Sequence, residues 1–334
     1  MLFRSVQGVA TQPGISLADF AFANSGLLVY RPAGAQTRLL EWLDRKGATQ
    51  PANAPPQNYS GLRLSPDGER VAVQIQGADS TGSDIWICDL ARGSLARLTF
   101  DGLNSAPIWT PDGRRITFAH QEKADVGIYW VAADGSGKPG QLMGAVGIPT
   151  SWSPDGKTLL YDHVGTDNKP SIWMLPAPLS GVDGKPHPFL EAAYEQQSAQ
   201  ISPDGRWMVY VSNESGSPEV YVQPFPIQGG VHGGKTPIST HGGFEPRWSR
   251  TGQEIFFRTT SAIVTVSVQA TQTFRAIQSQ VLFPYSNSYG YSWDVAPERK
   301  GFLAIKYANS PGGRLQAVVN WFEELRPSGT RARK

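Results

Sequence analysis

The chain has 334 residues and a formal net charge of +2, and its single cysteine, Cys88, excludes an intrachain disulfide and any CxxC metal site. Only 17% of the residues are charged, so no basic surface for nucleic acid is indicated. No apolar run approaches the roughly 20 residues of a membrane-spanning helix, and we expect no membrane contact by this chain itself. The 36 glycines, 26 prolines and 10 tryptophans favour short strands and many turns, which is typical of an all-β protein.

One four-residue phrase recurs along the chain. It reads SPDG, TPDG, SPDG and SPDG at intervals of 45, 43 and 49 residues, and its copies end at Gly68, Gly113, Gly156 and Gly205. Weaker copies at nearly the same period end at Gly26, Gly252 and Gly301. A fixed period of this length is typical of a repeat protein.

Each turn glycine is followed by a short β-rich run, a polar loop and a second run. After Gly113 these runs read RITFAH and GIYWVAA, and after Gly205 they read WMVYVS and EVYVQPF. A short strand precedes the turn, and a weaker fourth strand closes the unit. Four strands in each unit of ~45 residues is the pattern of a β-propeller blade.

The repeat therefore predicts an all-β fold, a seven-bladed β-propeller of four-stranded antiparallel blades in one domain over residues 1–326. The expected blades are 16–56, 57–102, 103–147, 148–193, 194–242, 243–285 and 286–326. Because a closed ring hides its edge strands, residues 2–10 are expected to complete the last blade. Six blades is the alternative, since the first and last units are the least regular. Residues 327–334 are expected to form a flexible basic tail.

The residue types of the phrase are those that a tight turn requires. Proline presets φ at the first corner, aspartate bonds to the local backbone, and glycine adopts the positive φ. The predicted structural turn residues are Pro66, Asp67, Gly68, Pro111, Asp112, Gly113, Pro154, Asp155, Gly156, Pro203, Asp204 and Gly205. A catalytic role for the four aspartates is disfavoured, because copies spread around a ring do not converge on one substrate.

No motif in the sequence predicts catalysis. A GxSxG nucleophile elbow is absent, and HGGF at 241–244 and DGSGKPG at 134–140 are interpreted as loops. The five histidines lack metal-ligand spacing, although His120 and His163 end equivalent strands of adjacent blades and are the best candidates to approach each other. We therefore expect no catalytic residue, no metal and no cofactor.

The tryptophans recur at regular places in the units. They end the inner strands or lie in the third strands, at Trp109, Trp152 and Trp248 and at Trp86, Trp130 and Trp173. Large flat side chains fill the wedge between neighbouring sheets, so we interpret them as core rather than as a carbohydrate-stacking platform. Cys88, in an alternating strand pattern, is interpreted as core as well.

Binding is expected on the face made by the second-to-third-strand loops and the connections between blades, because these segments vary while the PDG turns form the other face. Ordinary solvated loop residues are the alternative interpretation for every candidate. The candidate ligand- or partner-contacting residues are Asp101, Asn104, Tyr194, Glu195, Asn213, Glu214, Glu245 and Tyr289.

Several longer stretches carry a family resemblance. LSPDGERVAV, SNESGSPEVYVQPFP, GGFEPRWSRTGQEIFF and VVNWFEEL resemble the WD-repeat-like, TolB-type propeller found as the C-terminal region of many bacterial serine/threonine protein kinases. The resemblance covers about residues 16–326. It implies a sensor or interaction module preceded by a kinase domain and a membrane span, outside the cytoplasm. No kinase motif occurs in this chain, so nothing catalytic is carried over.

The first residues, MLFRS, are also what the end of a common sequencing adapter encodes, and we expect the reading frame to be a fragment of a longer one. The module would then be extracytoplasmic or periplasmic; with Met1 as the true start it would be cytoplasmic. We expect a monomeric, non-catalytic module that binds a protein or a small molecule. The alternatives are a propeller hydrolase, lactonase or lyase with a channel metal, and a TolB-like envelope interaction protein.

Overall fold

The computed structural model describes residues 20–23, 25–30, 37–77, 82–122, 125–165, 169–176, 184–189, 193–225, 234–285, 292–296, 301–307 and 316–319. Within these ranges the chain forms strands and turns, and it has no helix long and apolar enough to cross a lipid bilayer. The chain divides into a larger unit, Arg38–Lys306, and a smaller unit made of Met1–Thr37 and Tyr307–Lys334. The described strands form seven sheets, and this number matches the seven repeat units of the sequence. The predicted all-β propeller fold is therefore confirmed.

The larger unit contains six sheets of four strands each. Their strands are β5 (Tyr59–Leu64), β6 (Arg70–Gln76), β7 (Ser83–Asp89) and β8 (Ser94–Arg97); β9 (Asn104–Trp109), β10 (Arg115–Glu122), β11 (Asp125–Ala132) and β12 (Gly140–Met143); β13 (Ile148–Trp152), β14 (Thr158–Val164), β15 (Pro170–Pro176) and β16 (His187–Pro188); β17 (Gln196–Ile201), β18 (Trp207–Ser212), β19 (Glu219–Pro224) and β20 (Thr236–Pro237); β21 (Phe244–Trp248), β22 (Glu254–Arg258), β23 (Ala262–Ala270) and β24 (Phe274–Pro284); and β25 (Trp293–Val295), β26 (Phe302–Tyr307), β3 (Arg38–Leu43) and β4 (Thr49–Pro51).

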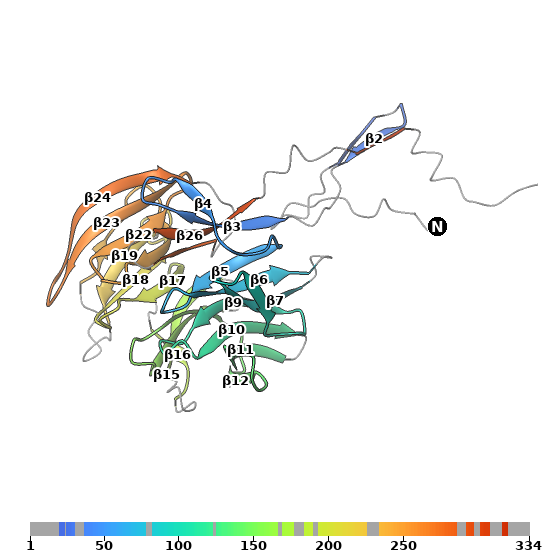
Figure 1. Ribbon diagram of the computed structural model, residues 1–334. Helices are drawn as coiled ribbons and strands as arrows, with labels where there is room; N and C mark the ends of the chain where they lie inside the picture. Colours follow the sequence, from blue (N-terminus) through green and yellow to red (C-terminus); the bar gives the residue numbers. More distant parts are fainter. Residues whose placement is uncertain are drawn as a thin grey trace, which may run out of the picture. The chain divides into compact units, whose positions relative to one another are not determined.

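These six sheets close into a ring. The inner strands contact one another in the cycle β5, β9, β13, β17, β21, β25 and back to β5. The closing sheet joins β25 and β26 to β3 and β4, and Figure 1 shows the blue strands β3 and β4 beside the much later β26. Pairing strands from opposite ends of the unit covers the edges that an open sheet would expose.

The smaller unit holds the seventh sheet, which has three described strands rather than the four expected. They are β1 (Phe20–Phe22), β2 (Leu27–Tyr30) and β27 (Gln316–Val319), with β2 antiparallel to both neighbours. The strands of the first predicted blade, 16–56, and of the last, 286–326, are therefore divided between this sheet and the closing sheet of the ring. The predicted closing strand, residues 2–10, and the tail lie outside the described residues.

The core of the ring lies in the wedges between its sheets. Trp109, Trp152 and Trp248 are 8%, 7% and 4% exposed. Each indole N–H reaches across to an adjacent sheet: Trp109 donates to the Arg63 carbonyl at 2.9 Å and Trp152 to the Thr117 hydroxyl at 3.0 Å. Cys88 is fully buried, and burial raises the pKa of its thiol to about 11. These side chains are core, as the repeat predicts.

The repeated phrase forms the turn between the first two strands of a sheet. At residues 65–68 the Ser65 hydroxyl donates to the Asp67 carboxylate at 2.5 Å, and Asp67 accepts the N–H of Glu69 at 3.0 Å. Gly68 closes the turn with φ of 74°, where a side chain would be strained. The face of the ring that carries these turns is called the turn face below. The opposite face, with the connections 98–103, 144–147 and 193–195 between successive sheets, is called the loop face.

Candidate functional site

The inner strands share an irregularity that shapes the centre of the ring. Five of them shift register against their second strand in the middle of the pairing. At this bulge Ala106, Ser198 and Glu245 take φ values of 51°, 58° and 50°, an uncommon conformation for residues other than glycine. A β-bulge re-aims the side chains that follow it. In four of these strands the residue two places before the turn hydroxyl lines the central channel; these residues are Arg63, Ile108, Ser151 and Gln200.

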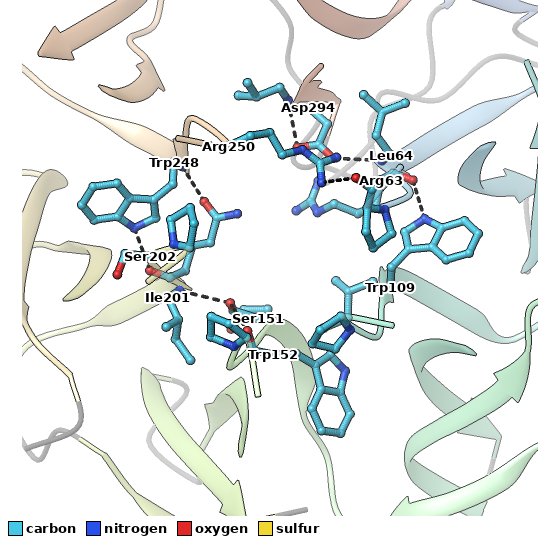
Figure 2. Close-up of a pocket in the computed structure, with 18 of the residues that line it drawn as sticks. Arg63, Leu64, Trp109, Ser151, Trp152, Ile201, Ser202, Trp248, Arg250 and Asp294 are labelled. Atoms are coloured by element: carbon cyan, nitrogen blue, oxygen red, sulfur yellow. Dashed lines mark hydrogen bonds between the residues drawn. The ribbon is translucent and has the colours of Figure 1, made fainter. Parts of the chain in front are cut away.

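A cavity of about 380 Å³ lies in this channel, lined from all six inner strands. Figure 2 shows its wall, with the indoles of Trp109, Trp152 and Trp248 turned outward between the sheets. The proline rings of four turns surround one end; they belong to Pro66, Pro111, Pro154 and Pro203. The fifth turn, SRTG, has Arg250 where the others have proline.

Arg250 reaches from its own turn to the turn that follows β5. Its Nη1 donates to the Pro66 carbonyl at 2.9 Å, and its Nη2 donates to the Ser65 carbonyl at 2.8 Å. In Figure 2 the side chains of Arg250 and Arg63 both point into the cavity. Arg63 is 9% exposed, and its Nη1 donates to the Leu62 carbonyl at 2.9 Å.

Arg247 occupies in β21 the position that Arg63 occupies in β5. It is 4% exposed, its Nη1 donates to the Pro246 carbonyl at 2.8 Å, and its Nε lies 3.7 Å from Oδ1 of Asp294. Asp294 is part of the cavity wall, and its Oδ2 accepts the N–H of Leu64 at 2.9 Å. Arg63, Arg250 and Asp294 therefore line the cavity, and Arg247 lies behind this wall, beside Asp294.

On the loop face, a polar cluster surrounds Asn104 at the start of β9. The Asn104 amide is fully buried and donates to Asp84 at 3.1 Å and to Asp101, while its Oδ1 lies 3.0 Å from Nδ1 of His120. Nε2 of His120 is 3.8 Å from Asp125. Asp84 also accepts the Thr99 hydroxyl at 2.8 Å and the N–H of Gly102 at 3.1 Å, bonds that anchor the connection between two sheets.

The second group of predicted residues lies two sheets further along the loop face. Asn213 accepts the N–H of Glu195 at 2.9 Å and donates its own N–H to the Glu195 carbonyl at 3.2 Å. Glu214 accepts a hydrogen bond from Lys235, and the Lys235 ammonium lies 5.8 Å from the centre of the Tyr194 ring. Tyr194 is 40% exposed.

The structure thus brings Asp101 together with Asn104, and Tyr194, Glu195, Asn213 and Glu214 into one neighbourhood. Glu245 is 6% exposed and forms an ion pair of 3.1 Å with Arg258. Burial makes Asn104 and Glu245 unsuited to direct contact with a partner, because their polar atoms are turned to the interior. Tyr289 lies outside the described residues.

His120 and His163 were the best candidates for a pair of histidines that approach each other. In the described part of the chain no contact joins the two imidazoles, and Nδ1 of His163 instead faces the Val146 carbonyl at 3.2 Å.

The loop face also exposes large apolar side chains from successive sheets. They are Phe100 at 73%, Val146 at 48%, Val164 at 38% and Tyr194 at 40%. The Arg97 guanidinium lies 5.0 Å from the centre of the Phe100 ring. Among the residues that the structure describes, no group of three or more His, Cys, Asp and Glu side chains is placed to hold a metal ion.

Sequence reasoning missed the charged channel. Arg63 and Arg247 lie in strands whose facing direction depends on the bulge, which leaves no residue signature of its own, and Asp294 lies in the three-residue strand β25. Arg250 did carry a signal, because it replaces the proline of an otherwise regular turn phrase.

The ring of four-stranded sheets around a central channel defines this part of the chain as a β-propeller module. Two solved structures similar to the chain are TolB propellers. The putative TolB from Agrobacterium tumefaciens is 17% identical, covers 82% of this chain and 99% of its own, and has a TM-score of 0.61. TolB from Acinetobacter baumannii is 19% identical, covers 76% of this chain and 68% of its own, and has a TM-score of 0.51.

A putative 6-phosphogluconolactonase from Bacteroides uniformis is 16% identical over 85% of this chain and 96% of its own, with a TM-score of 0.52. At such identities these likenesses show the fold alone. Among curated proteins, the "Uncharacterized peptidase YuxL" of Bacillus subtilis is 33% identical over 106 residues. That match spans 29% of this chain and 16% of the peptidase. No protein-family model matches the chain.

Proposed function

We propose that this chain is a non-catalytic propeller module that binds a protein partner through its loop face. The observation that carries the proposal is the set of exposed apolar side chains on that face. Phe100, Val146 and Tyr194 come from three successive connections between sheets, and Val164 lies in a neighbouring loop. Apolar side chains gathered on one face and bordered by charged groups are typical of a protein-binding surface.

The cationic groups beside the two aromatic rings support the same reading. Arg97, which is paired with Asp84 at 2.5 Å, lies near Phe100, and Lys235, which is paired with Glu214, lies near Tyr194. Aromatic and arginine side chains are enriched among the residues that dominate binding energy. Ion pairs at the rim orient a partner more than they add affinity.

The finer part of the proposal is that the module is the sensor region of a receptor-like bacterial serine/threonine kinase whose kinase domain lies elsewhere in the full protein. The motifs SNESGSPEVYVQPFP and NWFEEL support this assignment. Longer source DNA provides the test: a kinase domain and a membrane span encoded upstream are expected. A promoter and stop codon directly before Met1 would contradict the assignment.

Docking on the loop face is tested with a double variant, Phe100→Asp with Tyr194→Asp. We expect proteins captured from a bacterial envelope extract by the wild-type chain to be retained at least about tenfold less by this variant. The matched control is Ile277→Asp, which changes a side chain that is 66% exposed on β24, away from the loop face. Equal retention by all three proteins would refute the docking surface.

Enzymatic activity is the alternative, and the polar cluster favours it. His120 lies between Asp101 and Asp125, at 3.8 Å from each carboxylate, and such a group suits proton transfer. Metal analysis followed by ester, lactone and uronate substrates, with and without chelator, tests this reading. Turnover that is lost on addition of chelator, or in His120→Gln, would replace the binding-module proposal.

A further inference from the structure

The outer strands of the six ring sheets differ in length. Five of them are two to four residues long, whereas β24 has 11 residues, Phe274–Pro284. Short outer strands leave little open edge with which another chain can pair. β24 is the last strand of its sheet, and Figure 1 shows it as the long orange strand at the margin of the ring. It therefore carries the longest open edge among the described strands of the ring.

Both ends of β24 are held in the core. The Phe274 ring centre lies 5.4 Å from that of Trp207, and Phe283 is 3% exposed, with its ring centre 5.7 Å from that of Phe302. The strand pairs with β23 along its whole length, and no other backbone hydrogen bond of β24 is found in the described part of the chain. Between its ends, all seven residues of 275–281 are exposed. A well-anchored strand thus presents a row of unpaired backbone groups on its outer edge.

The exposed part of β24 has a self-complementary sequence. Residues 276–282 read AIQSQVL, with Ser279 at the centre, a glutamine on each side and apolar residues beyond them. Ile277 and Val281, two positions from the centre, are 66% and 62% exposed. In an antiparallel pair of such strands centred on Ser279, each Ile277 lies opposite Val281 of the second copy, and each glutamine lies opposite a glutamine. A two-fold interface requires this kind of self-complementarity.

The charge on the strand also selects the antiparallel arrangement. Arg275 is the one charged residue of β24. A parallel pair in register would place the two arginines side by side, and like charges directly opposite destabilise a pair of strands. In the antiparallel pair each Arg275 lies opposite Phe283 of the second copy, about 27 Å from the other Arg275. The register against β23 shifts next to Ile277 and Leu282, so residues 278–281 form a regular ladder at the centre of the pair.

We propose that β24 pairs with β24 of a second copy of this chain, antiparallel and with Ser279 on the two-fold axis. Two four-stranded sheets then become one continuous sheet, in place of the monomer that the sequence led us to expect. A single pair of strands buries less than the roughly 1,200 Å² of a stable interface, so the dimer is weak, with a dissociation constant of about 10–100 μM. No residue of the loop face enters the pair, so this proposal does not depend on the protein partner proposed above.

Sedimentation velocity of the purified chain, over about 5 to 200 μM, measures the association. We expect the average mass to rise with concentration from that of a monomer toward that of a dimer and no further. Growth stops there because pairing the two edges with each other leaves neither of them open. A chain that stays monomeric at the highest concentration overturns the proposal, and so does growth beyond the dimer.

Charges at the centre of the pair test its register. Ser279→Lys and Ser279→Glu each place like charges opposite each other on the axis, and each should weaken association at least about tenfold. An equal mixture of the two variants should restore the dimer, because opposite charges then meet on the axis. The matched control, Ser94→Lys, changes an exposed serine on the short outer strand β8 and should associate like wild type. Wild-type association in both Ser279 variants, or no recovery in their mixture, overturns the proposal.

Cross-linking separates antiparallel from parallel pairing. Cys88 is fully buried, so an introduced cysteine supplies the reactive thiol. Opposite residues of an antiparallel pair have Cα atoms about 4.5–5.5 Å apart, which a disulfide can span. Under a mild oxidant Ser279→Cys should form a covalent dimer, and Arg275→Cys, whose two copies lie at opposite ends of the pair, should not. No cross-link in Ser279→Cys, or equal cross-linking in both, overturns the proposal, and thermal unfolding checks that each variant is folded.

Discussion

The two faces of the ring are built differently. On the turn face, one hydrogen-bonding scheme is repeated: the hydroxyl of Ser65, Ser153 or Ser202 donates to the aspartate two residues later. On the loop face a different scheme anchors two of the connections: Asp84 or Glu219 accepts a hydroxyl, from Thr99 or Ser239, and the N–H of the glycine three residues further on. Repeated residues stabilise the fold, and candidate binding groups lie where the repeat is broken. Arg250, which replaces a turn proline, breaks the repeat on the turn face and bonds to the carbonyls of Ser65 and Pro66.

The largest effect is expected in a wedge between sheets. Trp152→Ala removes a side chain that is 7% exposed and bonded to Thr117, and it should lower the free energy of unfolding by about 3–5 kcal/mol. Urea unfolding followed by circular dichroism measures the loss. Tyr194→Ala, on the loop face, should change stability by no more than about 0.5 kcal/mol. Similar losses at both positions would contradict the distinction between repeated and variable residues.

A buried carboxyl should make stability depend on pH. Burial raises the pKa of Asp162 from its usual 3.8 to about 7, against the lowering effect of the Ser198 N–H bond. The native state keeps this proton to about pH 7, whereas the unfolded chain releases it near 3.8. Stability should therefore fall as pH rises through this window, by about 4 kcal/mol if the full shift applies. Asp162→Asn should flatten this slope in chemical unfolding series.

Asp155, in a turn, provides the opposite control. The hydrogen bond from Ser153 lowers the pKa of this aspartate, so its contribution to stability is present above the usual pKa and is lost as pH falls. In Asp155→Asn the free energy of unfolding should therefore fall less than in wild type as the pH drops below 4. Its change with pH between 4 and 7 should be the same as in wild type. Slopes that change alike in both variants would show that Asp162 does not titrate as proposed.

A smaller effect is expected from the turn glycines. Gly205 has φ of 72°, so Gly205→Ala should cost about 1–2 kcal/mol in thermal unfolding. Gly234 has open space around an added Cβ and no positive φ, and Gly234→Ala should leave stability within about 0.5 kcal/mol of wild type. An unchanged Gly205→Ala variant would mean that the turn relaxes to another conformation.

The smallest effect on stability is expected where the repeat is restored. Arg250→Pro rebuilds the turn phrase; it loses two bonds to carbonyl groups and gains a stiffer turn. These terms offset, and stability should stay within about 1 kcal/mol of wild type. Thermal unfolding measures the change, and a loss well above about 1 kcal/mol would show that the two arginine bonds outweigh the stiffer turn.

Much of the candidate loop face could be read from the sequence, because it follows from the position of each loop in its repeat unit. Asp101, Tyr194 and Glu214 lie on that face. Tyr194 is 40% exposed, Asp101 lies near His120, and Glu214 is paired with Lys235. Asn104 and Glu245 were expected in the same loops but are buried, since one anchors a connection and the other lies at a bulge. Local sequence reports which segment a residue belongs to, and the packing of adjacent sheets determines which way it points.

The sequence by itself determined the all-β repeat, its turns and the tryptophan wedges. Each of these depends on residue types a few positions apart and on a period of constant length. The tertiary structure decided how the ends of the ring pair through β26 and β3, and that Arg63, Arg250 and Asp294 line one cavity with Arg247 beside Asp294. These residues lie up to some 230 positions apart, so only closure of the ring brings their charges together.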